Sequence, residues 1–357
     1  MVKKSKRKVV YIGLSGGVDS SVSALLLKNQ GHDVRGVFIK VWQPDWIKCN
    51  WKEDRRDAMR ICARLNIPFY TLNLENEYKH DVIDYMIAEY TKGNTPNPDV
   101  MCNKYIKFGA FYNWAKKNEG DYIATGHYAQ IINNKLLCGI DKDKDQSYFL
   151  WNIKREQLKH ILFPVGELRK REVRKIAKDN NFINHAKKDS QGLCFIGKLD
   201  FKDFLKRYVP NKSGDVLDLA GNVIGRHPGS IFFTIGERHG FEIFKKSSDQ
   251  RPLFIVSKDV KRNAITVSSD VDEGKSNISH ENTISTKETN WISRTQAKVG
   301  DKFLARARYR QDFFGVKLDK IINNKMFFSY NTDLLMASGQ SLVIYRDKEC
   351  MGGGIIE

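Results

Sequence analysis

The sequence predicts an α/β protein: an N-terminal parallel sheet with helices on both faces, followed by a smaller β-rich part. Up to about residue 200, short apolar runs alternate with amphipathic stretches of helix length, which is typical of strand–helix–strand units. A glycine-rich turn joins the first apolar run to the first amphipathic stretch. After about residue 208 the helical periodicity stops and short alternating segments recur, which indicates strands.

The N-terminal part begins with an apolar run over residues 9–12, which predicts a buried strand that ends at the glycine-rich turn. The elements expected after it are a helix over 21–29, strands over 34–40, 69–74 and 122–124, and helices over 53–65, 77–92 and 106–117. Ligands of such parallel sheets bind at the carboxyl ends of the strands, where the glycine-rich turn lies.

The β-rich part divides at a polar stretch, residues 268–282, which is typical of a linker. Before it, Ala220–Asn222 and His227–Gly229 are hairpin signals. After it, strands are expected over 302–310, 315–321, 325–330, 341–346 and 350–356. Their spacing predicts a small β-barrel or sandwich. We therefore expect domains at 1–207, 208–278 and 279–357.

Charge points to a polyanionic partner. The 357-residue chain has 60 Lys and Arg against 42 Asp and Glu, a net charge of +18 spread along its length. Nucleic acid is the simplest such partner, although a lysine-rich proteome would give the same excess. Arg306, Arg308 and Arg310 alternate along one predicted strand, so they fit either a phosphate backbone or a solvated face.

The sequence lacks features that are typical of membrane proteins, exported proteins and proteins with a cysteine-bound metal. It has no run of eighteen apolar residues and no apolar leader after its basic N-terminus, so we expect a cytoplasmic protein with no membrane partner. Its six cysteines are widely separated, with no C-x-x-C pair, which argues against a zinc ribbon or an iron–sulfur cluster. We expect no protein-bound metal site.

The glycine-rich turn is the strongest chemical signal. A strand, this turn and a helix start aim several backbone N–H groups at one point, which suits a phosphate. The turn is neither a Walker A loop nor a G-x-G-x-x-G fingerprint, and an ordinary tight turn is the alternative. The candidate phosphate-binding residues are Gly13, Leu14, Ser15, Gly16, Gly17, Val18, Asp19 and Ser20.

Cys102 follows a stiff segment, Thr95–Asp99, that contains two prolines. We expect Cys102 near the start of the next helix, where the helix dipole would lower the pKa of its thiol. Asp99 could exchange a proton with a substrate. The alternative is that Asp99 only caps the helix and that Cys102 is a buried core residue.

Two further segments are weaker signals. Cys194 lies among glycines, which would let a loop carry its thiol between two sites, or it could simply pack beside Phe195. His127 follows Gly126 just after a predicted strand, beside the glycine-rich turn, although a lone histidine is more often structural. The segment Lys144–Gln146 is polar and could be plain surface.

Together these motifs resemble, over nearly the full chain, the tRNA-specific 2-thiouridylase family of PP-loop ATP pyrophosphatases. The resemblance rests on residues 13–20, 97–102, 124–128, 144–146, 192–197 and 352–357 in this order. It implies a Rossmann-like PP-loop domain, a small central domain and a C-terminal β-barrel. It also implies ATP-dependent replacement of O2 by sulfur on the wobble uridine of tRNAs for Lys, Glu and Gln, with Mg²⁺ on the pyrophosphate.

The same resemblance assigns roles to single residues. Ile39 and Gly126 would lie against the adenosine. Cys194 would carry sulfur as a persulfide received from a donor protein, and Cys102 would be the nucleophile that releases or transfers it, leaving a Cys102–Cys194 disulfide. Asp99 would be the acid–base residue. The tRNA contacts implied are Asn97, Pro98, Asp99, His127, Lys144, Asp145, Gln146, Arg308, Tyr309 and Gln340.

Four positions depart from the expected pattern, namely Tyr105, Gln191, Leu193 and Ile39, which puts details of fit in doubt but not the reaction. Two other functions stay open at this point. One is another PP-loop ligase, such as a tRNA lysidine synthetase or an argininosuccinate synthase, neither of which needs paired cysteines. The other is a basic RNA-binding protein with a degenerate nucleotide loop. The sequence does not show which protein donates the sulfur, whether free sulfide or the persulfide itself attacks the uridine, or what the oligomeric state is.

Overall fold

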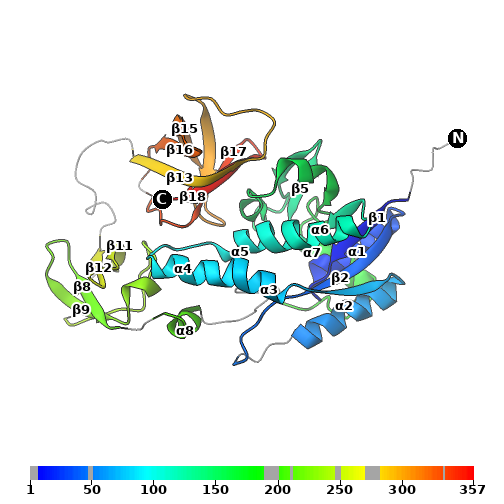
Figure 1. The fold of residues 1–357 in the computed structure, drawn as a ribbon, viewed down its shortest axis with the longest axis horizontal. Helices are drawn as coiled ribbons and strands as arrows, with labels where there is room; N and C mark the ends of the chain where they lie inside the picture. The colour runs from blue at the N-terminus through cyan, green and yellow to red at the C-terminus, as the bar shows by residue number, and fades with distance from the viewer. Residues whose placement is uncertain are drawn as a thin grey trace.

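The computed structural model describes residues 7–46, 51–188, 201–209, 212–245, 251–269, 282–332 and 334–357. The chain forms an α/β part, a small middle β part and a C-terminal β-barrel, and one long helical segment runs from the α/β part toward the middle part (Figure 1). This arrangement confirms the expected fold class.

The N-terminal sheet is parallel throughout, with strand order β3-β2-β1-β4-β7. Its strands are β1 (Val9–Gly13), β2 (Asp33–Lys40), β3 (Phe69–Asn73), β4 (Tyr122–Ala124) and β7 (Ile161–Leu162). The order reverses at β1, which has β2 on one side and β4 on the other. Ligands bind at such a reversal, beyond the carboxyl ends of the strands, and the glycine-rich turn follows β1 there.

Helices cover both faces of this sheet. Apolar side chains of α1 (Val18–Asn29), α2 (Trp51–Leu65) and α7 (Lys170–Asp179) form one core with β1 and β2. The other face is covered by two runs, each containing a π-helical stretch. The first run is α3 (Glu75–Tyr78), η1 (Lys79–Asp84) and α4 (Tyr85–Thr91), and the second is α5 (Pro98–Met101), η2 (Cys102–Phe111) and α6 (Tyr112–Lys117). Short 3-10 turns follow at η3 (Ser147–Phe149) and η4 (Arg155–His160).

The middle part follows α8 (Phe201–Lys206) and contains a sheet of order β10-β9-β8-β12-β11. Its strands are β8 (Gly214–Leu217), β9 (Val223–His227), β10 (Glu242–Ile243), β11 (Phe254–Asp259) and β12 (Ala264–Ser268). The turn Ala220–Asn222 joins β8 to β9, as predicted. His227–Gly229 is not a hairpin turn, because the 3-10 helix η5 (Ser230–Phe232) follows it and β10 returns only later.

The C-terminal part is a six-stranded antiparallel barrel of order β13-β16-β15-β14-β17-β18, closed by pairing of β13 with β18. Its strands are β13 (Asn282–Trp291), β14 (Lys302–Arg306), β15 (Phe314–Ile322), β16 (Lys325–Tyr330), β17 (Ser341–Arg346) and β18 (Glu349–Ile356). The sequence did not predict β13, and β14 is shorter than the expected strand over 302–310.

A hairpin of the N-terminal part extends the barrel sheet. It consists of β5 (Ala129–Ile132) and β6 (Lys135–Cys138). Strand β6 lies beside β18, and the Cys138 N–H donates to the Lys348 carbonyl oxygen at 2.9 Å. The first and third domains therefore share one sheet. Within the ranges described above, no helix is both long and apolar enough to cross a membrane.

Candidate functional site

The glycine-rich turn leads directly from β1 into α1. Gly17 is the N-cap of α1, and among the described residues no side chain caps this helix, so its first N–H groups are oriented toward an incoming anion. Gly16 has a φ of +72°, and a Cβ there would lie 2.5 Å from the Asp54 carbonyl oxygen. Only glycine fits this position, which lets α2 pack closely behind the loop.

Gly126 and Ile39 flank the same loop. A Cβ on Gly126 would lie 2.7 Å from the Ser20 amide nitrogen, so the turn after β4 packs tightly against the start of α1. Ile39 is buried at the end of β2, where its Cδ1 would contact a Cβ on Gly13 at 4.0 Å. The structure thus brings the loop Gly13–Ser20, Ile39 and Gly126 together.

Asp19, in the second position of α1, is held by two partners. The Tyr128 hydroxyl donates to Asp19 Oδ1 at 2.7 Å, and Lys170 Nζ lies 2.8 Å from each Asp19 carboxylate oxygen. Lys170 was not among the predicted site residues, because it lies 151 positions from Asp19 and no local motif marks it.

Cys102 lies deeper in its helix than expected. The helix begins at Pro98, and its N-cap is Asn97, whose Oδ1 accepts from the Val100 N–H at 3.3 Å. Asp99 is therefore not the cap. Cys102 is the fifth helical residue and its own N–H bonds to the carbonyls of Pro98 and Asp99. The electrostatic effect of a helix N-terminus falls off within the first turn. Cys102 therefore does not lie at the N-terminal position that the sequence predicted for it.

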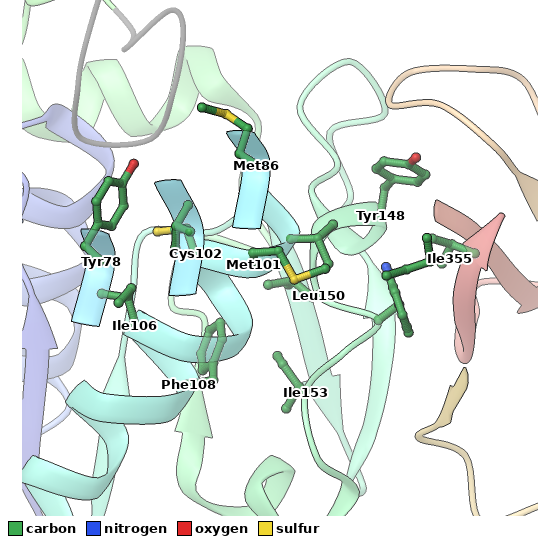
Figure 2. Packing of buried hydrophobic residues seen from close by; sticks show 14 of the residues in the cluster. Tyr78, Met86, Met101, Cys102, Ile106, Phe108, Tyr148, Leu150, Ile153 and Ile355 are labelled. Atoms are coloured by element: carbon green, nitrogen blue, oxygen red, sulfur yellow. The ribbon is translucent and has the colours of Figure 1, made fainter. Parts of the chain in front are cut away.

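The Cys102 side chain is fully buried. It belongs to the core on the α4–α6 face of the sheet, which also contains Tyr78, Met101 and Ile106, and Figure 2 shows it among these residues. The Cys102 thiol is therefore shielded from bulk solvent.

The segment just before Asn97 contacts both other domains. The Thr95 N–H donates to the Ser338 carbonyl at 2.7 Å, and Gln340 Nε2 donates to the Thr95 carbonyl at 2.8 Å. Thr95 Oγ1 donates to Thr234 Oγ1 of the middle part at 3.3 Å. All three domains therefore meet at Thr95, two residues before Asn97.

The expected row of arginines on one strand is wrong, because β14 ends at Arg306. Arg308 Nη2 donates instead to the carbonyls of Ile235 and Leu335, both at 3.1 Å, and so joins the middle part to the barrel. Arg310 has a φ of +62° in a turn. Between them, Tyr309 packs on Phe149 with ring centroids 4.5 Å apart.

His127 and Asp145 are buried. His127 is 6% exposed, lies between Phe108 and Phe163, and has its Nδ1 2.6 Å from Thr125 Oγ1. Burial and the nearby Lys107 ammonium hold its pKa well below 6.5. Asp145 is 3% exposed and accepts from the Gly139 and Ser147 amides. Both placements favour structural roles over direct RNA contact.

The two residues beside Asp145 are half-buried. Gln146 Oε1 accepts from the Tyr128 N–H at 3.0 Å, which connects this segment to the turn that carries Gly126. The Lys144 N–H donates to the Asp141 carbonyl at 3.0 Å.

The structure gives no support to a disulfide. In the described part of the chain Cys62, Cys102, Cys138 and Cys350 form no disulfide with one another, and Cys194 lies outside the described residues. Burial raises the pKa of the Cys62 and Cys138 thiols to about 12. The described residues also contain no group of three or more His, Cys, Asp or Glu that could hold a metal ion.

Comparison with family models divides the chain in three. Residues 8–198 match a tRNA methyl transferase HUP domain, residues 202–269 a tRNA methyl transferase PRC-barrel domain, and residues 281–356 an aminomethyltransferase beta-barrel domain. Together with the loop after β1, these matches define a HUP-domain protein with a middle PRC-barrel and a C-terminal β-barrel.

Full-length relatives identify the family. The chain is 42% identical to the tRNA-specific 2-thiouridylase MnmA of Geobacillus thermodenitrificans, over 98% of this chain and 94% of the relative. It is also 42% identical to the protein of the same name from Psychromonas ingrahamii, over 100% of this chain and 99% of the relative. The chain belongs to the tRNA-specific 2-thiouridylase MnmA family, which is a family of sulfurtransferases.

Proposed function

We propose that the chain uses ATP to replace O2 of the wobble uridine by sulfur in the tRNAs for Lys, Glu and Gln. One observation supports this above the others: the helix capped by Asn97, together with the segment before it, connects the phosphate loop to the middle domain and the barrel. The segment before it contacts the middle domain and the barrel through Thr95. Further along, Phe111 lies 3.7 Å from a Cβ built on Gly13 of the phosphate loop.

Activation of the uridine comes first. A carbonyl oxygen is a poor leaving group, so transfer of AMP from ATP to O2, with release of pyrophosphate, would make it displaceable. The loop Gly13–Ser20 would bind the phosphates, and Ile39 and Gly126 would lie against the adenosine. Mg²⁺ bound together with ATP would neutralise the pyrophosphate.

Sulfur transfer comes second. Cys194 would receive a persulfide from a donor protein. Attack of the Cys102 thiolate on the inner sulfur forms a Cys102–Cys194 disulfide and releases hydrosulfide. The hydrosulfide attacks C2 of the uridine, AMP leaves, and loss of one proton gives the thiocarbonyl. A thiol reductant then returns two electrons to the disulfide. Burial of Cys102 would keep water and oxidants from competing.

The target base would lie against Asn97, Pro98 and Asp99, with Asp99 as the acid–base residue. It must leave its stack to reach this segment. Gln340 bonds to Thr95, and Arg308 bonds to Ile235, which adjoins the Thr234 that Thr95 contacts. We assign these two residues and Tyr309 to contacts with the neighbouring nucleotides. We assign His127 and Asp145 an indirect part, in which they position Lys144 and Gln146, because both are buried.

Mass analysis of tRNA nucleosides tests the proposal. The protein is incubated with unmodified tRNA, ATP, Mg²⁺ and a competent persulfide donor, and 2-thiouridine is expected. Cys102→Ser and Cys194→Ser should abolish it yet retain tRNA-dependent pyrophosphate release, whereas Cys62→Ala should retain both. Thiolation by either serine variant would contradict the assigned cysteine roles, and no thiolated uridine with the wild-type protein would contradict the function.

A further inference from the structure

An ion pair lies inside the candidate phosphate site. Lys170 Nζ contacts both carboxylate oxygens of Asp19 at 2.8 Å, and Asp19 Oδ1 also accepts from the Tyr128 hydroxyl at 2.7 Å. The Lys170 side chain is 12% exposed and that of Asp19 is 29% exposed. Because Asp19 is the second residue of α1, the ammonium lies near the N-terminus of this helix.

The helix that carries Lys170 is held in place at both of its ends, and the contact after its end is to the phosphate loop and the start of α1. At its start, the Lys170 N–H donates to Asp141 Oδ2 at 2.8 Å. Just after its end, Asn184 Nδ2 donates to the Gly16 carbonyl at 3.0 Å and to Ser21 Oγ at 2.9 Å. Helix α7 therefore holds the backbone of Lys170 at a fixed place relative to the loop.

The charges of the Lys170–Asp19 pair affect how strongly the loop attracts the phosphates of ATP. A lone carboxylate at Asp19 would repel an anion at the amides of α1, and Lys170 offsets that repulsion. An ammonium has three donors at the end of a flexible stem, so Lys170 can contact Asp19 and a phosphate oxygen together. A triphosphate also carries more negative charge than Asp19 alone, which favours moving the ammonium toward it.

We propose that Lys170 contacts the β- or γ-phosphate of ATP and is a further catalytic residue of the activation step. This inference rests on the proposed function. As the bond between the α- and β-phosphates breaks, negative charge accumulates on the departing pyrophosphate, and a positioned ammonium stabilises it. Tyr128 and Asp19 are positioning residues that hold the ammonium ready before ATP arrives.

Lys170→Gln tests this role, with Lys175→Gln as the matched control because Lys175 is an exposed lysine of the same helix. For Lys170→Gln we expect tRNA-dependent pyrophosphate release to fall about 100-fold or more, as when a preorganised charge partner is removed. The Kd for ATP should rise at least about tenfold while the Kd for adenosine stays unchanged, since only ATP carries phosphates. The control should behave like the wild-type protein in each assay.

The double variant Asp19→Asn, Lys170→Gln separates phosphate contact from simple charge balance. If Lys170 only neutralises Asp19, removing both charges should restore ATP binding, and that result would overturn the proposal. Equal weakening of ATP and adenosine binding would overturn it too. If wild-type protein releases no pyrophosphate with tRNA, the proposed function fails instead, so the two failures are distinguishable.

A measurement on the wild-type protein covers the case in which Lys170→Gln does not fold. Amine acylation of Lys170, followed by mass spectrometry, should be slowed by inorganic tripolyphosphate and not by adenosine. Identical acylation rates with and without tripolyphosphate, at concentrations that compete with ATP, would also contradict the contact.

Discussion

Arg306 Nη1 lies 2.7 Å from Asp145 Oδ2, and the two side chains are only 12% and 2% exposed. The pair joins the barrel strand β14 to the N-terminal domain. The Arg306 guanidinium also lies 3.9 Å from the centre of the Phe313 ring. Asp145 accepts in addition from Ser147 Oγ at 3.1 Å. This buried pair is a fixed connection between the two domains.

Removing one member of this pair should be costly. Arg306→Met leaves the Asp145 carboxylate buried without its cation, so we expect the free energy of unfolding to fall by about 3 kcal/mol. Urea titration measures the loss. Lys135→Met, which breaks the more exposed pair with Glu349 on the neighbouring strands, should cost less than about 1 kcal/mol. Equal decreases in the free energy of unfolding would show that the buried pair stabilises the protein no more than the exposed pair does.

Gly126→Ala should impair nucleotide use. The new Cβ would meet the Ser20 amide nitrogen at 2.7 Å, so the phosphate loop must shift. A shift of this size at a reacting centre lowers rates about 100-fold, which steady-state pyrophosphate release would detect. The matched control is Gly315→Ala, where a Cβ meets nothing within 4 Å. Full activity of Gly126→Ala would place the nucleotide elsewhere.

Gly339→Ala should separate tRNA use from ATP binding. A Cβ at Gly339 would lie 2.9 Å from the Thr95 amide nitrogen, so the barrel loop would be pushed away from the segment before Asn97. We expect kcat/KM for tRNA to fall about 100-fold through misplacement, with the Kd for ATP unchanged. Gly300→Ala is the control, because Gly300 has a similar φ of +94° but open space around it. If both variants lose activity alike, backbone strain and not the junction is responsible.

His127 should make stability depend on pH. Burial lowers its pKa in the folded protein well below 6.5, so below about pH 6.5 the unfolded chain takes up a proton that the folded protein does not. Stability is therefore full above pH 6.5 and falls as the pH decreases toward the lowered pKa. His127→Gln should reduce this dependence in urea titrations between pH 5 and 7, although burial also lowers the pKa of His160 and His227. His80→Gln, at an 84% exposed side chain, should leave the slope unchanged.

The parallel sheet and most barrel strands could be predicted because their side chains alternate or are uniformly apolar. Strand β13 was missed since its sequence is mostly polar, with Ile284 and Thr286 among its few buried side chains. The β5–β6 hairpin did carry a local signal. Asn133 and Asn134 both have positive φ, as a tight hairpin turn requires, and the Asn-Asn pair could have indicated it.

The candidate site was predictable only where its residues form a local motif. The loop Gly13–Ser20 is contiguous, so its geometry follows from the strand and helix beside it. Lys170 and the junction at Thr95 depend on contacts between distant segments, which no short pattern encodes. The prediction of an arginine row was wrong for a related reason. Alternating residues share one face only within a strand, and β14 ends at Arg306.

The pairing of β6 with β18 has a consequence for how the chain matures on the ribosome. Cys138 is synthesised more than two hundred residues before Lys348, its hydrogen-bonding partner. The β5–β6 hairpin therefore has an unpaired edge at β6 while the middle domain and most of the barrel are synthesised. Such an edge invites pairing with other chains. Slow translation or early termination should thus favour aggregation, and the β6 edge is where chaperone protection would matter most.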